Sequence, residues 1–358
     1  MESARSPICR QSLILATISA VISLHFDRSV DTFWMACLRF VQPRKQTMDP
    51  IAPPTPASRR SPGARMRELF NRPGIMIAPG VYDGFSLRLV EQMGYKTAAI
   101  SGAALSESTL GWADVGIMGY AENLRASGAL AAISSIPLSA DGDTGYGNAL
   151  NVYFTVQGFE RAGLACLLIE DQVWPKRCGH MEGKQVISVE EGVEKIRAAS
   201  EARRDPDFVI KARTDATAIY GVGEAIRRLN LYAEAGADLL FADALLTAED
   251  IGTVARNVIK PLTVNMGFGI RQRPTTPLLS ARQLEDLGVK AVSYPRMLTA
   301  AAIQGMKNAL AVFGQSIEEE RVIDRPDLLV PFGELNELMG LSRLRTIEKS
   351  FAAPPSGT

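Results

Sequence analysis

The segment Phe208-Val209-Ile210-Lys211-Ala212-Arg213 is a short apolar and β-branched run that ends in a charged residue. Runs of this kind recur along the chain, and a longer stretch with helical periodicity separates each run from the next. Alternation of short apolar strands with helices is typical of folds in which helices cover a parallel sheet. The unit at 208–213 therefore indicates an α/β fold for the whole region that repeats it.

Eight strand–helix units can be placed in this region, and eight units predict a closed (β/α)8 barrel, or TIM barrel. A doubly wound sheet is the rival fold, but it needs fewer strands and no Gly-x-Gly-x-x-Gly loop follows the first strand. The barrel is expected over residues 66–315. The expected strands are 76–79, 97–101, 137–141, 166–170, 208–213, 239–243, 262–265 and 291–294.

The two ends of the chain differ from the barrel region. Residues 1–65 hold an apolar run at 12–26 and a Pro-, Ser- and Arg-rich linker at 48–65. We expect a poorly ordered extension, a targeting segment, or a start set too early, with Met48 or Met66 as the true beginning. Residues 316–358 are expected to form a helical extension with an amphipathic helix at 334–349. Its apolar stripe would pack on its own barrel or between subunits.

Charge and cysteine content narrow the class of function. The 358 residues include 39 Lys and Arg against 39 Asp and Glu. This balance gives no reason to expect a nucleic acid or a membrane as partner. Four scattered cysteines do not make a disulfide framework and favour a reducing compartment. We expect a cytoplasmic protein, and organellar targeting by the N-terminal segment stays open.

Polar residues follow the ends of all eight expected strands. Barrel enzymes place their active sites at the C-terminal ends of the strands, so these residues are the candidates for chemistry. Asp83 and Asp215 lie close to helix starts and are better explained as caps or structural bonds. The candidates are Asp83, Ser101, Asp141, Asp143, Glu170, Asp171, Arg213, Asp215, Asp243, Asn265 and Arg296.

Asp141 and Asp143 flank Gly142 after the third strand. In extended backbone, residues two apart point the same way, and adjacent carboxylates repel unless a cation or a proton lies between them. Oxygen ligands suit Mg2+, with Mn2+ as a second choice, and Asp114 and Glu170 would hold its waters from a second layer. The alternative is a carboxylate pair satisfied by turn N–H groups.

The segment Lys176-Arg177-Cys178-Gly179-His180 places a thiol among cations. Nearby positive charge lowers the pKa of a thiol, and a thiol of intermediate pKa can give its proton to a carbanion. We predict Cys178, Lys176 and His180 as catalytic, with His180 as an orienter or a substrate donor. Gly179 lets the backbone approach a ligand. The alternative for Cys178 is a loop thiol without a role, whereas Cys166 is expected to be core packing.

We also predict Arg213 as catalytic, because it ends an apolar strand and offers a planar fork that suits a substrate carboxylate. Asn265 would add an amide hydrogen bond at the same mouth of the barrel. A salt bridge from Arg213 to Asp215 or to Asp243 is the alternative.

Several of these segments, taken in order, resemble the isocitrate lyase / phosphoenolpyruvate mutase superfamily from about residue 66 to 313. The nearest branch is similar to methylisocitrate lyases and dimethylmalate lyases. One such motif alone is weak, whereas several in order are specific. They are Ser101-Gly102-Ala103, Asp141-Gly142-Asp143-Thr144-Gly145-Tyr146-Gly147, Glu170-Asp171-Gln172, Lys176-Arg177-Cys178-Gly179-His180 and Ala212-Arg213-Thr214-Asp215-Ala216.

The resemblance implies a Mg2+-dependent TIM barrel, a homotetramer and a C-terminal helix exchanged between subunits. It implies that Asp141 and Asp143 lie at the metal and that the loop at 173–184 is a mobile gate. Asp243 stands where the lyases usually have glutamate, Ala103 where many have glycine, and the Asn265 segment lacks a hydroxyl-bearing residue. The implied substrate contacts are Ser101, Gly102, Ala103, Cys178, Gly179, Arg213, Asp243 and Asn265.

These observations predict a carbon–carbon lyase that cleaves a 2-hydroxy di- or tricarboxylate to a 2-oxo acid and a succinate-like acid. Rivals on the same fold are an oxaloacetate decarboxylase and a phosphonopyruvate mutase or hydrolase, including a carboxyvinyl-carboxyphosphonate phosphorylmutase-like enzyme. The cysteine segment favours the lyase. A barrel that binds a dicarboxylate without turnover is the third hypothesis.

Overall fold

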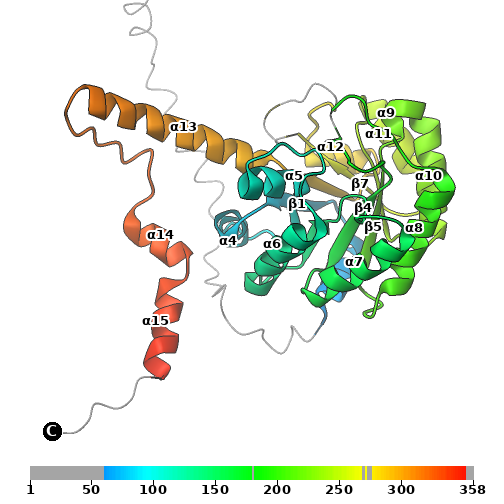
Figure 1. The fold of residues 1–358 in the computed structure, drawn as a ribbon, viewed down its shortest axis with the longest axis horizontal. Coiled ribbons are helices and arrows are strands. Elements are labelled where there is room, and N and C mark those ends of the chain that lie inside the picture. Colours follow the sequence, from blue (N-terminus) through cyan, green and yellow to red (C-terminus); the bar gives the residue numbers. More distant parts are fainter. Residues whose placement is uncertain (1–59, 180, 268–270, 272–275, 352–358) are drawn as a thin grey trace, which may run out of the picture. The chain divides into compact units, whose positions relative to one another are not determined.

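The computed structural model describes residues 60–351, apart from 180, 268–270 and 272–275. Eight parallel strands pair in the order of the sequence and close into a barrel (Figure 1). The (β/α)8 prediction is confirmed, and each strand agrees with its expected bounds to within two residues. The strands are β1 Met76–Val81, β2 Ala98–Ile100, β3 Leu138–Asp141, β4 Cys166–Glu170, β5 Val209–Thr214, β6 Leu239–Ala242, β7 Leu262–Asn265 and β8 Ala291–Tyr294.

The register of the strands brings polar residues to one level at the C-terminal end of the barrel. Glu170 on β4 lies opposite Arg213 on β5, and Arg213 lies opposite Phe241 on β6. Asn265 on β7 lies opposite Ser293 on β8. Because parallel strands all end at the same edge, residues far apart in sequence meet there.

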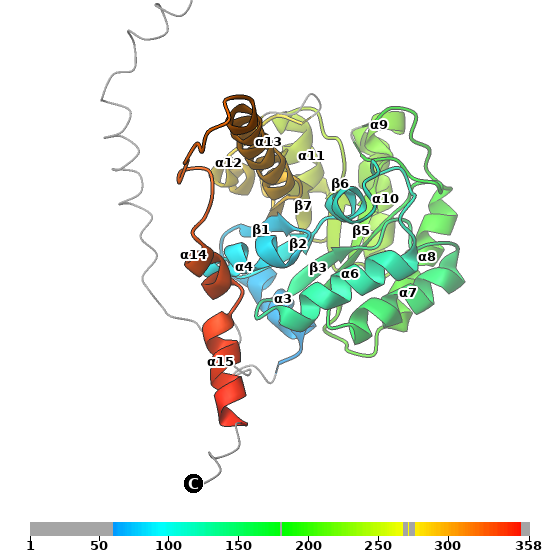
Figure 2. The same ribbon diagram turned by 60° about the vertical axis from the view of Figure 1, so that its left-hand side comes forward.

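Helices pack around the strands in both views (Figures 1 and 2). The main apolar core lies between strands and helices, with Phe159, Leu229 and Tyr232 fully or almost fully buried. Asp83 caps α4 through a capping box, as its place before a helix predicted. The helices are α4 Gly84–Gln92, α5 Gly102–Leu105, η3 Ser106–Leu110, α6 Tyr120–Ile133, α7 Ala149–Arg161, α8 Val189–Ala202, α9 Thr217–Tyr220, α10 Val222–Glu234, α11 Ala248–Asn257 and α12 Ala281–Asp286.

An additional helix, α3 (Pro62–Asn71), precedes the barrel and corrects the predicted linker over 62–65. Ser61 caps it and Pro62 fits its first position, so residues that looked like linker composition are a helix start. Met66 and Phe70 pack against Cys166, Val209 and Leu239 near the beginnings of their strands. This helix therefore contributes to the core at the N-terminal end of the barrel.

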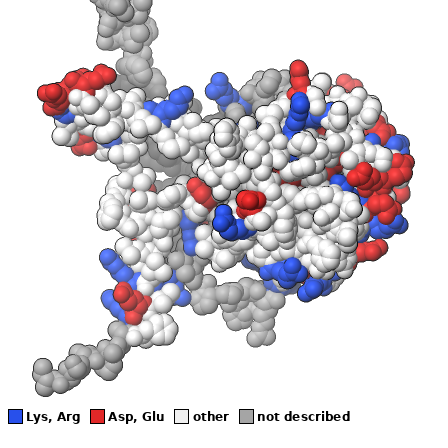
Figure 3. Space-filling view, in the orientation of Figure 1, with Lys and Arg blue, Asp and Glu red and all other residues white. Residues whose placement is uncertain are grey.

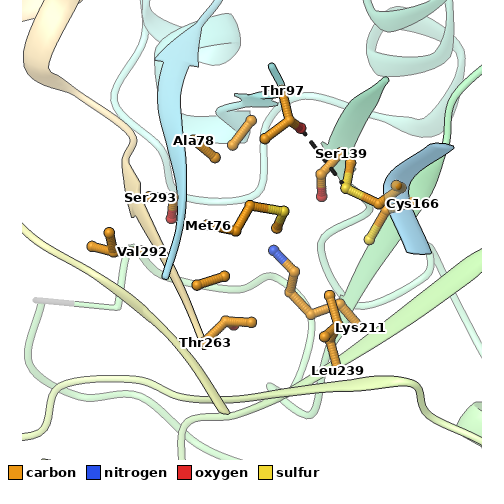
Figure 4. A pocket seen from close by; sticks show the side chains of 13 residues that line it. Met76, Ala78, Thr97, Ser139, Cys166, Lys211, Leu239, Thr263, Val292 and Ser293 are labelled. Atoms are coloured by element: carbon orange, nitrogen blue, oxygen red, sulfur yellow. Dashed lines mark hydrogen bonds between the residues drawn. The ribbon is translucent and has the colours of Figure 1, made fainter. Parts of the chain in front are cut away.

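A small cavity of ≈ 20 Å³ lies inside that N-terminal end (Figure 4). Thioethers, hydroxyls and the Cys166 thiol line it, together with the Lys211 side chain. Its volume suits about one water molecule. Cys166 is fully buried, and burial raises the pKa of its thiol. This placement supports the prediction that Cys166 serves packing.

The C-terminal segment consists of α13 (Met297–Glu318), α14 (Phe332–Leu338) and α15 (Leu341–Ser350). The predicted single helix over 334–349 is wrong, because Gly340 takes a left-handed conformation and separates two helices. Of the described side chains of α13, only Thr299 is buried. Broad uncharged areas lie over α13 and α14, while both signs of charge are interspersed on the barrel face in Figure 3. Within the described part of the chain, no helix is long and apolar enough to cross a membrane.

Candidate active site

The turn that follows β3 differs from the predicted geometry. β3 ends at Asp141, and Asp143 has a φ of 48°, in the left-handed region, so the two carboxylates do not alternate along an extended strand. The Asp143 N–H instead donates to Asp141 Oδ1 at 3.0 Å. A Cβ on Gly142 would lie 2.7 Å from Leu168 O, which requires glycine there. The alternative prediction, that N–H groups of the turn satisfy the carboxylates, is therefore correct for one oxygen of Asp141.

Lys176 lies between two carboxylates at this turn. Its Nζ is 2.5 Å from Asp114 Oδ1 and 2.8 Å from Asp143 Oδ1, and all three side chains are buried. Burial opposes the charge of Lys176, but Asp143, Glu170 and Asp114 raise its pKa well above the ordinary value. The lysine is therefore held as a cation inside an acidic cluster.

The acidic cluster has more negative than positive groups. Asp114, Asp141, Asp143 and Glu170 all act on the charge of Lys176. Burial raises the pKa of Asp143 to about 6 although Lys176 opposes the rise. Burial also raises the pKa of Glu170 well above its usual range, and its Oε1 is buried without a hydrogen bond. Such a cluster favours an additional cation.

A divalent metal of the Mg2+ type fits these residues. Asp141 and Asp143 supply oxygen ligands, and Asp114 and Glu170 lie close enough to influence the same lysine. Among the described residues, no group of three or more His, Cys, Asp or Glu side chains forms a ready-made cage. Mg2+ tolerates this arrangement, because it commonly binds through one or two carboxylates and keeps several waters.

The fork of Arg213 faces protein carboxylates. Its Nε and Nη2 donate to the two oxygens of Asp215 at 2.8 and 2.9 Å. Nη2 also lies 3.3 Å from Asp243 Oδ2, and Nε lies 3.3 Å from Glu170 Oε2. The salt-bridge alternative is therefore confirmed for both Asp215 and Asp243. Among the described residues, these ion pairs involve Nε and Nη2 of Arg213.

The cysteine segment lies against Arg213. The Cys178 N–H donates to Asp114 O at 3.1 Å, and Cys178 is half-buried. A Cβ on Gly179 would lie 1.7 Å from Asp243 Oδ2 and 2.5 Å from Arg213 Nη2, so only glycine allows this approach. His180 lies outside the described residues. The structure thus brings Cys178, Gly179, Arg213 and Asp243 together.

The Ser101-Gly102-Ala103 segment begins helix α5, which the sequence did not predict. Ser101 caps the helix, and its Oγ accepts a hydrogen bond from Ala104 N at 3.3 Å. A Cβ on Gly102 would lie 2.8 Å from Asp141 Oδ2, so this glycine borders the acidic cluster. Ala103 is buried. The segment therefore adjoins the Asp141 turn.

Asp243 is buried at the end of β6 with both carboxylate oxygens free of hydrogen bonds. Arg213 and Lys184 are its ion-pair partners, at 3.3 and 3.8 Å. The next residue, Ala244, has a left-handed φ of 56°, which marks a strained turn. Asn265 is the last residue of β7 and is partly buried. Arg296 pairs with Glu107.

One residue of the site, Lys184, was not singled out from the sequence, whereas Asp171 was among the candidates after the fourth strand. Lys184 donates from Nζ to Asp215 Oδ1 at 2.8 Å. Asp171 accepts from Thr214 Oγ1 and from the Asp215 N–H at 2.7 and 2.9 Å, which fixes the end of β5. The sequence places Lys184 in the cysteine loop, which could have marked it as a candidate. It does not show that the side chain extends to Asp215.

Comparison with known proteins identifies the family. The model of the family described as phosphoenolpyruvate phosphomutase matches residues 66–313. The chain belongs to this family. The 2,3-dimethylmalate lyase of Eubacterium barkeri is 37% identical over 81% of this chain and 98% of that enzyme. The 2-methylisocitrate lyase of Aeropyrum pernix is 39% identical over 74% of this chain and 83% of that enzyme.

Solved structures of the family are similar in fold as well. An oxaloacetate acetylhydrolase bound to 3,3-difluorooxalacetate has a TM-score of 0.76 and 28% identity, covering 82% of this chain and 98% of that one. A phosphonopyruvate hydrolase bound to oxalate and Mg2+ has a TM-score of 0.72 and 30% identity, covering 82% of this chain and 99% of that one. The predicted superfamily is therefore confirmed. The protein is an enzyme of the phosphoenolpyruvate mutase/isocitrate lyase superfamily, and its lyase relatives support carbon–carbon bond chemistry.

Proposed function

We propose that this enzyme is a Mg2+-dependent carbon–carbon lyase that cleaves a 2-hydroxy di- or tricarboxylate, of the methylisocitrate or dimethylmalate type. The products would be a 2-oxo acid and a second acid, which is succinate-like for a methylisocitrate-type substrate and a monocarboxylate for a 2,3-dimethylmalate-type substrate. One observation carries the proposal. Gly179, the residue after Cys178, lies so close to Arg213 and Asp243 that a Cβ there would overlap both side chains, so the cysteine loop reaches the barrel mouth.

Asp141 and Asp143 would hold the metal, with Asp114 and Glu170 behind them. Bound there, Mg2+ acts as a Lewis acid that stabilises negative charge on the oxygen atoms of the 2-oxo acid. The excess of carboxylates over Lys176 supports this placement. The complex of a family member with Mg2+ is consistent with it.

Cleavage leaves an electron pair on the carbon that the second acid retains. The hydroxyl loses its proton, its carbon becomes the carbonyl of the 2-oxo acid, and the carbon–carbon bond breaks. Arg213 would hold the second carboxylate, where its positive charge also stabilises the enediolate. Cys178 would then donate its thiol proton to the carbanion. Lys176 would keep the cluster beside the substrate at a fixed geometry.

A second candidate is an enzyme that acts on oxaloacetate. The fold similarity to an oxaloacetate acetylhydrolase favours it. Asp243 also favours it, because it differs from the glutamate expected in the lyases and shortens one wall of the site by a methylene. The two candidates share the metal site and differ in substrate, since cleavage of oxaloacetate also leaves an electron pair on carbon that must take up a proton.

The C-terminal helices support a proposed homotetramer. Ile303, Met306, Leu310, Phe313 and Ile317 on α13 are each at least half exposed, and their alternating spacing of three and four residues makes one apolar stripe. We propose that another subunit covers this stripe, with α13–α15 exchanged as an extension of the barrel. Light scattering tests this: Leu310→Glu should lower the molecular mass, and an unchanged mass would contradict it. The predicted division at 315 falls inside α13, so the proposed extension begins at Met297. We separately propose a cytoplasmic location.

A substrate screen tests the lyase proposal. Purified enzyme is assayed with methylisocitrate, dimethylmalate, oxaloacetate and phosphonopyruvate, with Mg2+ and with excess chelator. We expect release of a 2-oxo acid from one of the first two substrates, lost on chelation. Turnover of oxaloacetate or phosphonopyruvate alone would reject the lyase in favour of the second candidate or of the mutase and hydrolase class.

A further inference from the structure

Lys184 connects the cysteine loop to the end of β5. Its Nζ donates to the Gly179 carbonyl at 2.6 Å and to Asp215 Oδ1 at 2.8 Å. Nζ also lies 3.8 Å from Asp243 Oδ2. The side chain is only 3% exposed, so these contacts form away from bulk water. Hydrogen bonds to a buried charged group are among the stronger ones in proteins.

The acceptor on the barrel side is itself fixed. Asp215 is fully buried, its N–H donates to Asp171 at 2.9 Å, and its carboxylate receives both nitrogens of the Arg213 fork. Arg213, Lys184 and their hydrogen bonds outweigh the effect of burial and lower the pKa of Asp215 to about 2. Lys184 therefore binds the loop to a carboxylate that is rigid and ionised.

The loop is held on the other side of the thiol by different groups. Gln172 exchanges two hydrogen bonds with the Arg177 backbone, at 2.9 and 3.0 Å. The Cys178 N–H donates to Asp114 O. On the other side, Lys184 holds the carbonyl of Gly179, the residue that follows Cys178. The thiol thus lies between two anchors, and Lys184 is the anchor on the side of Arg213.

We propose that Lys184 is a positioning residue that links the Gly179 carbonyl to Asp215 and so aims the thiol at the space beside Arg213. The catalytic part of this inference rests on the proposed function. The positional part concerns only the loop and the barrel, and it is testable without a substrate.

The test compares Lys184→Met, which keeps the stem and removes the ammonium, with Lys184→Arg, which keeps a cation. Lys290→Met is the matched control, because Lys290 also donates to a backbone carbonyl, Gly74 O at 2.9 Å, but precedes β8 at the other end of the barrel. Each full-length variant is alkylated with iodoacetamide, and the modification of Cys178 is followed by peptide mass spectrometry over a range of pH. The plateau rate reports access to the thiol, and the midpoint reports its pKa.

We expect the plateau rate to rise about tenfold in Lys184→Met, as for loss of one hydrogen bond to a charged group. Lys184→Arg should lie between Lys184→Met and the wild type, and Lys290→Met should match the wild type. With a turned-over substrate, Lys184→Met should lower kcat about tenfold or more and change KM less. Should Lys184→Met fail to fold, Asp215→Asn removes the same anchor and should show the same rise.

A wild-type plateau rate in a folded Lys184→Met variant overturns the positional inference. An altered alkylation profile with unchanged kcat overturns the catalytic part alone. If none of the four acids is turned over, the lyase proposal fails while the alkylation result still decides the role of Lys184.

Discussion

The two described cysteines lie at opposite ends of the same barrel and in opposite surroundings. Cys166 begins β4, is fully buried, and packs with Met66 and Phe70 of α3. Cys178 lies past the end of β4 in a half-buried loop beside Asp114, Arg213 and Asp243. The N-terminal end of the barrel thus consists of apolar packing. The C-terminal end holds charged residues and left-handed turns at Asp143 and Ala244. This contrast separates stability from chemistry within one fold.

Removal of each thiol should separate the two ends most clearly. Cys178→Ala is expected to lower kcat by about 10²–10⁴-fold, the range typical of a lost general acid. The free energy of unfolding should change by less than about 0.5 kcal/mol, because Cys178 is half-buried. Cys166→Ala should leave kcat unchanged and lower stability by about 1 kcal/mol, because it removes only one buried sulfur. Steady-state kinetics measure kcat and urea unfolding measures stability for each variant. Equal losses of kcat in the two variants would contradict the difference between the two ends.

The packing end should respond to loss of a large side chain in the reverse manner. Met66→Ala removes a fully buried side chain from the α3 contact. We expect the free energy of unfolding to fall by about 2–5 kcal/mol, with kcat per folded molecule unchanged. Urea denaturation measures the free energy of unfolding, and kinetics with active-site titration gives kcat per folded molecule. A variant with unchanged stability would show that α3 is not part of the core.

The sequence predicted the barrel well because the period of its apolar runs is a property of the chain. It did not predict α3, because Pro62 and Ser61 have linker composition and act as a helix start only when Met66 and Phe70 find a surface to cover. It also misjudged the Asp141 turn, where Asp143 is left-handed and the Gly142 N–H donates to Leu168 O, a residue far away in sequence. The ion-pair partners of Arg213 and Lys184 could not be predicted either, because they depend on the strand register and on the conformation of long side chains.

The acidic cluster should make the metal-free enzyme sensitive to pH. The pKa of Asp143 is raised to about 6 in the folded state against 3.8 as its ordinary value. A raised folded pKa contributes stability that is fully present below the unfolded value and lost as pH rises through about 6. We expect chelated enzyme to lose a few kcal/mol between about pH 4 and pH 7 from this group, on the order of 1.4 kcal/mol for each pKa unit.

Asp143→Asn isolates this effect. The variant should show a flatter dependence of unfolding free energy on pH over the same range when chelated. Added Mg2+ should stabilise the wild type in proportion to its occupancy and the variant much less. If the unfolding free energy of Asp143→Asn depended on pH as that of the wild type does, Asp143 would not be one of the carboxylates that bind the metal.

A pH effect of the opposite sign concerns Asp215 at acid pH. Its pKa is lowered to about 2, so its contribution to stability is present above the unfolded value near 3.8 and lost as pH falls toward 2. The stability difference between wild type and Asp215→Asn should therefore shrink by about 2 kcal/mol over that interval. Urea unfolding at pH 5 and pH 2.5 measures the difference, and a constant gap would contradict it.

The most direct test of the central claim follows the proton that we propose Cys178 donates. The enzyme is run in D2O with Mg2+ and with methylisocitrate or dimethylmalate, and the second acid product is examined by NMR. We predict one deuteron at a single stereochemical position, because a positioned thiol delivers it from one face. Deuterium distributed over both positions, or product formed equally well by Cys178→Ala, would contradict the account.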